Sequence, residues 1–414
     1  MSWSALRPTL TSEETARLLE EAAQSLAGLP LATLRDRPAL AQEAEQALHR
    51  AARVLHLPLP PANQRQALLA QLLARVGGLG FLDALLPPAT FAFTDILLNA
   101  DGSVWARAKG HMAFQPLDLH PSPQEAWRAV ETLLASQGLA CTEATPSVDA
   151  KLPRHQEQGF GGARIKVLHP RIASGQGFPT LALRLFEPQP VPPERILAWG
   201  VLPQPVLDAL LQAVAQRLRL LVIGGTASGK TTLLAALAHG IPHQARIVKV
   251  EDPEEIWLPH PNVTTLEARP APPGSDVPAY TVAQGVDDAL RLAPSHLILG
   301  EVRTGQAALS LFRALMSDHA GLTTFHAHGP QEALARLGVL LLADAGVRLE
   351  AARGLFVQAM DLVVHLGWQE GRRTCLGVWE VAGLKGRTVQ FRSLWQPGQP
   401  TMQPPQRQRQ GASP

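Results

Sequence analysis

The chain has 414 residues, of which 46% are hydrophobic and 17% are charged, and its formal net charge is +2. Its apolar content excludes wholesale disorder, and its near-neutral charge gives no indication of a dedicated nucleic-acid-binding protein. Two cysteines, Cys141 and Cys375, are too few for a disulfide framework or a four-cysteine zinc site, which favours a reducing, cytosolic compartment. No apolar run approaches the ~18 residues that cross a bilayer, so we expect any membrane contact to be indirect.

Residues 1–77 are expected to form a helical N-terminal module. Apolar residues recur at helical spacing around Leu18 and Leu19, and again from Ala67 to Leu73. Prolines separate these stretches, which predicts several short helices rather than one long helix.

Residues 78–186 change in character and predict a mixed α+β domain. Residues 94–105 have the pattern of two strands joined by an Asp-Gly turn, and residues 123–137 have the pattern of a helix. Residues 164–168 and 180–185 alternate between apolar and polar side chains, as half-buried strands do.

Residues 187–200 begin with a proline-rich stretch and are interpreted as a linker, and residues 201–385 predict an α/β domain. Its apolar strand candidates are Leu220–Ile223, Ile247–Val250 and Leu297–Leu299. Because helical segments alternate with these strands, the order favours a parallel sheet flanked by helices.

Residues 386–414 are expected to form a C-terminal extension. From Gln396 onward the chain is rich in glutamine and proline and has few apolar residues. This composition predicts a disordered tail, because too little apolar surface is present to offset the entropy of ordering.

The segment Gly224–Thr231 matches the phosphate-binding pattern G-x-x-x-x-G-K-[ST]. An apolar strand precedes it and a helix-forming run follows, so phosphate oxygens are expected at a helix N-terminus. Lys230 is expected to reach the terminal phosphates, and the Thr231 hydroxyl is a candidate Mg²⁺ ligand. The candidate nucleotide-binding residues are Gly224, Gly225, Thr226, Ala227, Ser228, Gly229, Lys230, Thr231 and Thr232.

Two acidic residues directly follow apolar strand candidates. Glu251 follows Val250, and Glu301 follows Gly300 at the end of another strand. Ligands of open α/β sheets bind at the carboxyl ends of strands, so both carboxylates are candidates to handle the attacking water and Mg²⁺. The alternative for each is a solvated loop charge, and Glu254 and Glu255 are interpreted as surface charge.

His326 and His328 alternate along a strand candidate and are therefore expected to face opposite sides. One interpretation is a buried core histidine and a surface histidine. The other makes His326 a sensor that hydrogen-bonds the γ-phosphate.

In this order, the motifs resemble those of the type II/type IV secretion traffic ATPase superfamily, and most closely those of the Tad/Flp pilus assembly ATPases. In the pattern of that family, Gly224–Thr231 is the Walker A loop, Val250–Glu254 the acidic Asp box and Gly300–Arg303 the atypical Walker B. His319 together with Thr324–Ala327 matches the His box.

The resemblance implies a RecA-like P-loop motor domain, preceded by a smaller PAS-like α+β domain that packs on the nucleotide. It implies ATP and Mg²⁺ as cofactors, with Thr231 and Glu301 at the metal, partly through water. It makes Glu251 the general base and His326 the γ-phosphate sensor. Arg164 and Arg184 resemble the arginines that reach the phosphates when the domains close, and the alternative for both is a salt bridge on a strand face.

The resemblance also implies a homohexameric ring at the cytoplasmic face of the inner membrane. Such a ring would act on a membrane platform protein to drive assembly or secretion of pilin-like proteins. Two other functions stay open: a DNA uptake or conjugation motor, and a regulator that binds nucleotide without hydrolysing it. The near-neutral charge disfavours the DNA motor, because gripping DNA requires tracks of lysine and arginine.

Overall fold

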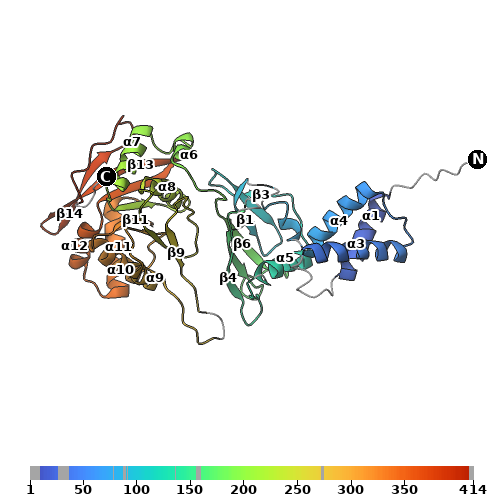
Figure 1. The fold of residues 1–414 in the computed structure, drawn as a ribbon. Helices are drawn as coiled ribbons and strands as arrows, with labels where there is room; N and C mark the ends of the chain where they lie inside the picture. The colour runs from blue at the N-terminus through green and yellow to red at the C-terminus, as the bar shows by residue number, and fades with distance from the viewer. Residues whose placement is uncertain are drawn as a thin grey trace, which may run out of the picture. The chain divides into compact units, whose positions relative to one another are not determined.

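The computed structural model describes residues 10–26, 37–77, 79–86, 90, 92–135, 137–154, 160–271 and 275–409 (Figure 1). The chain divides into two compact units, and each is described by itself. The first comprises Met1–Lys109 and Ala113–Phe186, and the second Gly110–Met112 and Glu187–Pro414. Among the described residues, no helix is long and apolar enough to cross a membrane.

Three helices are described at the start of the first unit: α1 (Ser12–Leu26), α3 (Arg37–Val54) and α4 (Ala62–Gly77). They bury an apolar cluster that includes Leu18 and Leu72, so each helix covers its apolar stripe against the other two. This arrangement confirms the predicted helical module for the described part of residues 1–77. The predicted residues 1–9 and 27–36 lie outside the described ranges.

A six-stranded antiparallel sheet follows, with the strand order β3-β2-β1-β6-β5-β4. Along β5 and β6, apolar side chains such as Ile165 and Leu183 point into a core with the helix α5, whereas Arg164 and Arg184 lie on the exposed face. The elements are η1 (Gly80–Leu82), β1 (Phe93–Leu98), β2 (Val104–Ala108), β3 (Gln115–Pro116), α5 (Pro123–Ala135), β4 (Ser147–Leu152), β5 (Ala163–Leu168) and β6 (Thr180–Leu185).

The second unit is built on an eight-stranded sheet with the order β14-β13-β12-β7-β11-β10-β8-β9. Six strands are parallel, and the hairpin of β13 and β14 adds two antiparallel strands beside β12. The strands are β7 (Leu220–Gly224), β8 (Ile247–Glu251), β9 (Val263–Glu267), β10 (His296–Leu299), β11 (Ala320–Phe325), β12 (Leu362–Gln369), β13 (Arg372–Lys385) and β14 (Thr388–Trp395).

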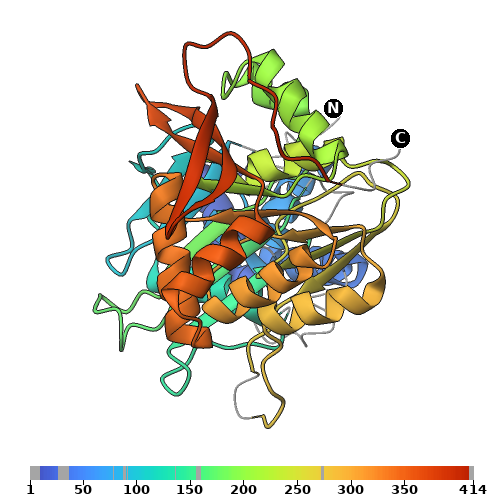
Figure 2. The ribbon, with the colours of Figure 1, turned by 90° about the vertical axis from the view of Figure 1, so that its left-hand side faces the viewer.

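Helices cover both faces of this sheet (Figures 1 and 2). Two apolar cores form, one under α7 and α8 and one under α9 to α12, as the continuous apolar runs of β7 and β10 require. The helices are α6 (Pro193–Ala198), α7 (Gln204–Ala215), α8 (Lys230–Leu237), η3 (Ala238–Gly240), α9 (Val282–Ala289), η4 (Leu290–Leu292), α10 (Gly305–Met316), α11 (Pro330–Ala345) and α12 (Leu349–Ala359).

The C-terminal region differs from its prediction. The main sheet continues past residue 385, because β14 pairs with β13, and the predicted linker contains α6. The tail from Gln396 to Arg409 is largely exposed but is ordered, because contacts at its C-terminal end anchor it. Its ordering comes from polar contacts with buried carboxylates: Glu380 accepts hydrogen bonds from the backbone N–H groups of Gln406 and Arg407, both at 2.7 Å.

Asp361 is the second anchor of this tail. It is fully buried and is paired with Arg407 at 3.0 Å and with Arg409 at 2.6 Å. The backbone N–H of Arg219, just before β7, donates to the same carboxylate at 2.9 Å. The prediction of disorder was based on the small number of apolar residues in the tail. It was wrong for residues 396–409, because these residues are ordered by ion pairs and hydrogen bonds, which such a count does not include.

Candidate nucleotide-binding site

The carboxyl ends of four parallel strands gather the predicted site residues at one edge of the second sheet. The loop after β7 carries the phosphate-binding motif, Glu251 ends β8, Glu301 follows β10, and His326 follows β11. Because parallel strands all end at the same edge, segments about 100 residues apart in sequence meet there.

The loop after β7 folds as the motif requires. Gly229 has φ 92° and caps α8, which begins at Lys230. A Cβ atom on Gly224 would lie 2.4 Å from the carbonyl oxygen of Leu366, so only glycine fits there. Ala227 adopts φ 59°, a left-handed conformation that non-glycine residues rarely take. The loop thereby leads directly into the N-terminus of α8, where backbone N–H groups and the helix dipole favour an anion.

Lys230 is folded back onto this loop. Its residue is 7% exposed, and its ammonium donates to the carbonyl oxygens of Gly224 at 3.1 Å and Gly225 at 2.9 Å. The same Nζ atom lies 3.4 Å from Nδ1 of His326. Thr231 and Thr232 follow in the first turn of α8 and are half-buried. Both residues therefore follow the loop directly in the chain.

His326 links the loop to Glu301. Its Nε2 lies 2.8 Å from Oε1 of Glu301, while Nδ1 faces Lys230. The tautomer that satisfies both contacts carries its proton on Nε2 and accepts from Lys230 at Nδ1. Burial lowers the pKa of His326, and the charge of Lys230 lowers it further, so the neutral ring is favoured.

Glu301 also accepts from Arg303 at 2.7 Å, and Arg303 donates to the backbone carbonyl of Asp252 at 3.2 Å. A chain of contacts therefore runs from Lys230 through His326 and Glu301 to the loop after β8. Both carboxylate oxygens of Glu301 are engaged, and the side chain is 20% exposed, so Glu301 is a fixed group at the strand ends rather than a mobile surface charge.

Glu251 is buried, with a residue exposure of 3%. Its Oε1 accepts from the backbone N–H groups of Glu255 at 3.1 Å and Ile256 at 2.9 Å, and its Oε2 accepts from Lys249 at 2.9 Å. Burial raises the pKa of Glu251 and outweighs the opposing effects of Lys249 and the backbone hydrogen bonds. A Cβ atom on Gly300 would lie 3.2 Å from Cγ of Glu251, so the two acidic loops are in direct contact.

Glu254 and Glu255 were both expected to be surface charges, and the structure places them differently. Glu254 is not a surface charge, because its carboxylate accepts from the buried Lys249 at 2.9 Å. Glu255 is exposed, as predicted.

Of the two other histidines considered in the sequence, His319 lies away from the site and His328 lies close to it. His319 lies before β11, at the amino edge of the sheet, where its Nδ1 is 3.0 Å from the carbonyl of Ala314. It therefore does not join the site. His328 does approach the loop, since its Cε1 would lie 3.6 Å from a Cβ atom on Gly225. Strand alternation, on which the expectation of opposite faces for His326 and His328 was based, does not apply to them, because β11 ends at Phe325.

Arg164 and Arg184 lie in the first unit, directly opposite each other in the register of β5 and β6. Arg184 is 3.2 Å from Asp95, and Arg164 is 3.9 Å from Asp149. These contacts are salt bridges on a strand face, which was the alternative to a phosphate-binding role for the two arginines. Both arginine side chains are nonetheless more than 40% exposed, at 43% and 46%, so the pairs leave them accessible.

Sequence reasoning missed Arg373 on β13. Its Nε donates to the carbonyl oxygen of Ala227 in the phosphate-binding loop at 3.0 Å, across 146 residues of sequence. Its guanidinium also lies over the ring of Trp368, 5.1 Å from the centroid. No local pattern signals such a contact, because it depends on the pairing of β13 with β12.

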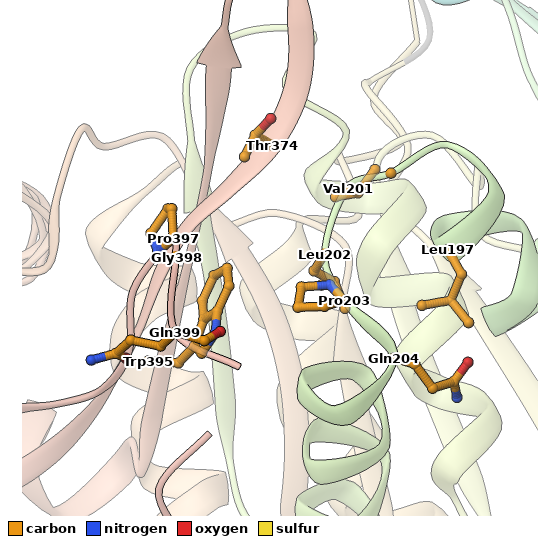
Figure 3. A pocket seen from close by; sticks show the side chains of 11 residues that line it. Leu197, Val201, Leu202, Pro203, Gln204, Thr374, Trp395, Pro397, Gly398 and Gln399 are labelled. Carbon is orange, nitrogen blue, oxygen red and sulfur yellow. The ribbon is translucent and has the colours of Figure 1, made fainter. Parts of the chain in front are cut away.

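A cavity of about 520 Å³ lies between the α6–α7 connection and the β13–β14 hairpin (Figure 3). Leu202 and Pro203 line one side, and Trp395 and Thr374 come from the hairpin. A partly apolar hollow of this volume is large enough for a heterocyclic base.

Comparisons with known proteins agree with this arrangement. Residues 125–366 match the family described as "Type II/IV secretion system protein". A Mycobacterium tuberculosis protein named for conjugal transfer is 32% identical over 320 residues, which cover 77% of this chain and 88% of that protein. The conjugal transfer protein TrbB of Rhizobium radiobacter is 30% identical over 280 residues, with coverages of 66% and 78%.

Two solved structures share the fold. The pilus retraction motor PilT with bound ADP aligns with a TM-score of 0.50 at 21% identity, covering 69% of this chain and 79% of that chain. The DotB ATPase of Yersinia pseudotuberculosis aligns with a TM-score of 0.51 at 19% identity, with coverages of 74% and 79%. These likenesses confirm the predicted RecA-like α/β fold. With the family match over more than half of its length, the chain belongs to the type II/IV secretion ATPase superfamily.

Proposed function

We propose that the protein hydrolyses ATP and uses the energy to drive a secretion or pilus machine. The observation that carries this proposal is the line of contacts from Lys230 through His326 to Glu301. It joins a phosphate-binding loop, a polar sensor and an acidic residue at the ends of three parallel strands. Phosphoryl transfer depends mainly on such positioning and on charge stabilisation.

Lys230 and the loop N–H groups would hold the β- and γ-phosphates. Without nucleotide, the ammonium bonds the loop carbonyls, and phosphate oxygens would replace these weaker neutral acceptors. His326, which touches Lys230 and Glu301 at once, would respond to the γ-phosphate by exchanging one of these contacts.

Thr231 and Glu301 fit Mg²⁺, because a hydroxyl at a helix N-terminus and a carboxylate at a strand end supply the oxygen ligands that this ion prefers. Glu301 would act partly through water. When bound there, Mg²⁺ would neutralise negative charge that develops on the phosphates.

Glu251 is proposed as the general base. Its raised pKa brings the carboxyl closer to the working pH, where a base is most effective. Lys249 and two backbone N–H groups hold the carboxylate in one orientation, and its contact with Gly300 sets it beside the loop of Glu301.

Arg164 and Arg184 are proposed to neutralise charge on the γ-phosphoryl group, a contribution of about 10³ to 10⁵ in rate for arginines of this type. Arg184→Ala should lower turnover while the first unit stays folded, because Asp95 keeps its shorter contact with Arg107 at 2.6 Å. Lys166→Ala provides a matched control. Lys166 lies on the same face of β5 as Arg164, the register partner of Arg184, and is also a cation paired with an aspartate, Asp149. Equal turnover in the two variants would contradict this role.

The cavity between the α6–α7 connection and the β13–β14 hairpin is proposed to receive the adenine base (Figure 3). Its lining from the α6–α7 connection and from Trp395 offers apolar surface to a planar ring, and Gln399 and Thr374 offer polar groups at the rim. An ATP preference over GTP would then depend on this cavity rather than on the phosphate-binding loop.

At the level of the machine, we propose a homohexamer at the cytoplasmic face of the inner membrane, acting on a membrane platform protein of a Tad/Flp-like pilus or secretion system. The second candidate is a conjugation or DNA uptake motor, which the conjugal transfer names of two relatives favour. The net charge of +2 disfavours direct binding to DNA, which requires many lysine and arginine contacts to phosphate. A regulator that does not hydrolyse nucleotide is disfavoured by the intact acidic residues Glu251 and Glu301.

The decisive experiment measures ATP hydrolysis by purified protein over a range of protein concentrations, beside Lys230→Ala. Specific activity should rise with concentration, because ring assembly organises the site, and Lys230→Ala should be inactive. ATP binding without turnover, both alone and with the membrane partner added, would favour the regulator. DNA binding that weakens steeply with salt would favour the conjugation motor.

A further inference from the structure

We propose that Arg373 is a positioning residue that fixes the phosphate-binding loop through the carbonyl of Ala227. It lies on β13, beyond residue 366, where the family match ends. The inference deepens the proposed function, because it assigns a role in nucleotide binding to the C-terminal hairpin, which none of the sequence motifs includes.

The guanidinium of Arg373 is held from two sides. Trp368 lies under it at 5.1 Å, and its Nε donates to Ala227 at 3.0 Å. Its Cδ also packs 3.5 Å from the position of a Cβ atom on Gly229. Stacking on an aromatic ring and a directed N–H bond fix the plane of an arginine in a way that a lysine cannot reproduce.

The bonded carbonyl belongs to the most unusual residue of the loop. Ala227 has φ 59°, a conformation that an alanine adopts only where its surroundings hold it. A hydrogen bond from a charged donor to its carbonyl is such a restraint, because it fixes the peptide group that follows Ala227, whose orientation depends on both backbone dihedral angles of this residue.

The consequence for phosphate follows from the geometry of the peptide unit. A trans peptide is planar, and its C=O and N–H point in opposite directions. When Arg373 holds the carbonyl of Ala227, the N–H of Ser228 must point to the other side, and there it lies 3.4 Å from the carbonyl of Gly225. This long contact is weak, so the N–H, held in this direction, keeps most of its capacity to donate to a phosphate oxygen that enters the loop.

Arg373 therefore prepares the Ser228 N–H for phosphate before nucleotide arrives. A restraint that acts equally in the ground state and the transition state changes affinity rather than the chemical step. Loss of Arg373 should accordingly raise the KM and the dissociation constant for nucleotide and leave kcat nearly unchanged.

The test compares Arg373→Met with Arg372→Met. Both remove a guanidinium from the start of β13, but Arg372 is exposed and is paired in the strand register with Gln369. Binding of a fluorescent ATP analogue and steady-state turnover are measured for the full-length chain. We expect Arg373→Met to raise the dissociation constant and KM about tenfold, which is typical for loss of a charged hydrogen bond, with kcat within about twofold and Arg372→Met unchanged.

Two additional variants separate orientation from charge and from misfolding. Arg373→Lys keeps the charge and should still lose most of the affinity, since lysine lacks the planar fork. Trp368→Leu should weaken binding less, and adding Arg373→Met to it should have a smaller effect than in the wild type, because the two side chains act as a unit.

The outcomes distinguish this inference from the proposed function. If the wild type binds the analogue without hydrolysing it and Arg373→Met weakens binding, the positioning role stands and the hydrolase proposal fails. If the wild type hydrolyses ATP and Arg373→Met binds normally, or if Arg373→Lys restores full affinity, the positioning role is overturned. Equal losses in Arg372→Met and Arg373→Met would also overturn it.

Discussion

Lys230 and His326 meet at the end of the central sheet, with Nζ and Nδ1 3.4 Å apart across 96 residues of sequence. The same imidazole contacts Glu301 through Nε2 at 2.8 Å. A single ring thus connects a group expected to bind phosphate with a group expected to bind Mg²⁺. This connection gives His326 a role that differs from general packing and that mutation can test.

We expect His326→Ala to lower ATP turnover by about tenfold to a hundredfold, the loss typical of a removed hydrogen bond to a charged group, while nucleotide still binds. His326→Gln should retain more activity, because its amide can accept from Lys230 and donate to Glu301 at the same time. Turnover and analogue binding measured in parallel check this order. Equal activity of both variants would show that the ring does not act through these two contacts.

Glu251→Gln is expected to abolish turnover and spare ATP binding, because the amide cannot take up a proton from water. Glu254→Gln is the matched control, since Glu254 contacts the same Lys249 at 2.9 Å. It should retain turnover if only Glu251 acts as the base. Single-turnover hydrolysis with excess enzyme is the measurement, and near-normal hydrolysis by Glu251→Gln would remove this residue from the mechanism.

A buried histidine should make the second unit sensitive to acid. Burial, with smaller effects from Arg217 and His260, lowers the pKa of His296 from 6.5 to about 4. Between these values the unfolded chain binds a proton that the folded chain does not, so stability falls as the pH drops from about 6.5 to about 4. The residue is 3% exposed, and the shift corresponds to a loss on the order of 3 kcal/mol.

Urea unfolding at pH 7 and pH 4.5 measures this loss. His296→Leu, which fills a similar volume without titrating, should lose less stability between the two pH values than the wild type does. His243→Ala, which changes an exposed histidine, should behave like the wild type. An identical pH dependence of His296→Leu and the wild type would exclude His296 as the source.

The tail contacts predict a large effect of truncation. A chain ending at Gln403 lacks Arg407 and Arg409 and leaves the carboxylate of Asp361 buried with its main partners removed. Removing partners from a buried ion pair costs about 3–5 kcal/mol. Asp361→Asn in the truncated chain should recover part of this loss, because a neutral amide is cheaper to bury than a charge.

Thermal unfolding of the four combinations of tail and residue 361 tests this account. The recovery by Asp361→Asn should appear only in the truncated background. A truncated chain that unfolds at the same temperature as the full chain would show that the contacts of Arg407 and Arg409 contribute nothing measurable.

The sequence was most informative where the functional residues are close together in the sequence. The phosphate-binding loop is contiguous, so the loop, the strand before it and the helix after it could be predicted from the sequence alone. The rule that ligands bind at strand ends also brought Glu251 and Glu301 to the correct edge of the sheet.

Prediction was weakest where the determining contact lies far away in the chain. His319 was grouped with His326 because both match the His box of the family, yet they lie at opposite ends of β11. Arg373 reaches the loop because β13 pairs with β12, near the C-terminal end of the chain. The tail is ordered by contacts with Asp361 and Glu380 rather than by its own composition. In each case the physical cause is a long-range contact that no local pattern encodes.

The buried Asp361 also has a consequence for the order of events during synthesis. Its arginine partners follow it by 46 and 48 residues. Before residues 407–409 have been synthesised, β12 can pair with β7 only while the Asp361 carboxylate at its start lacks both arginine ion pairs and keeps the contact with Arg219. The second unit should therefore complete its folding late, after the arginines have emerged, and nascent chains stalled before Arg407 should be more easily cleaved by proteases than chains stalled after Arg409.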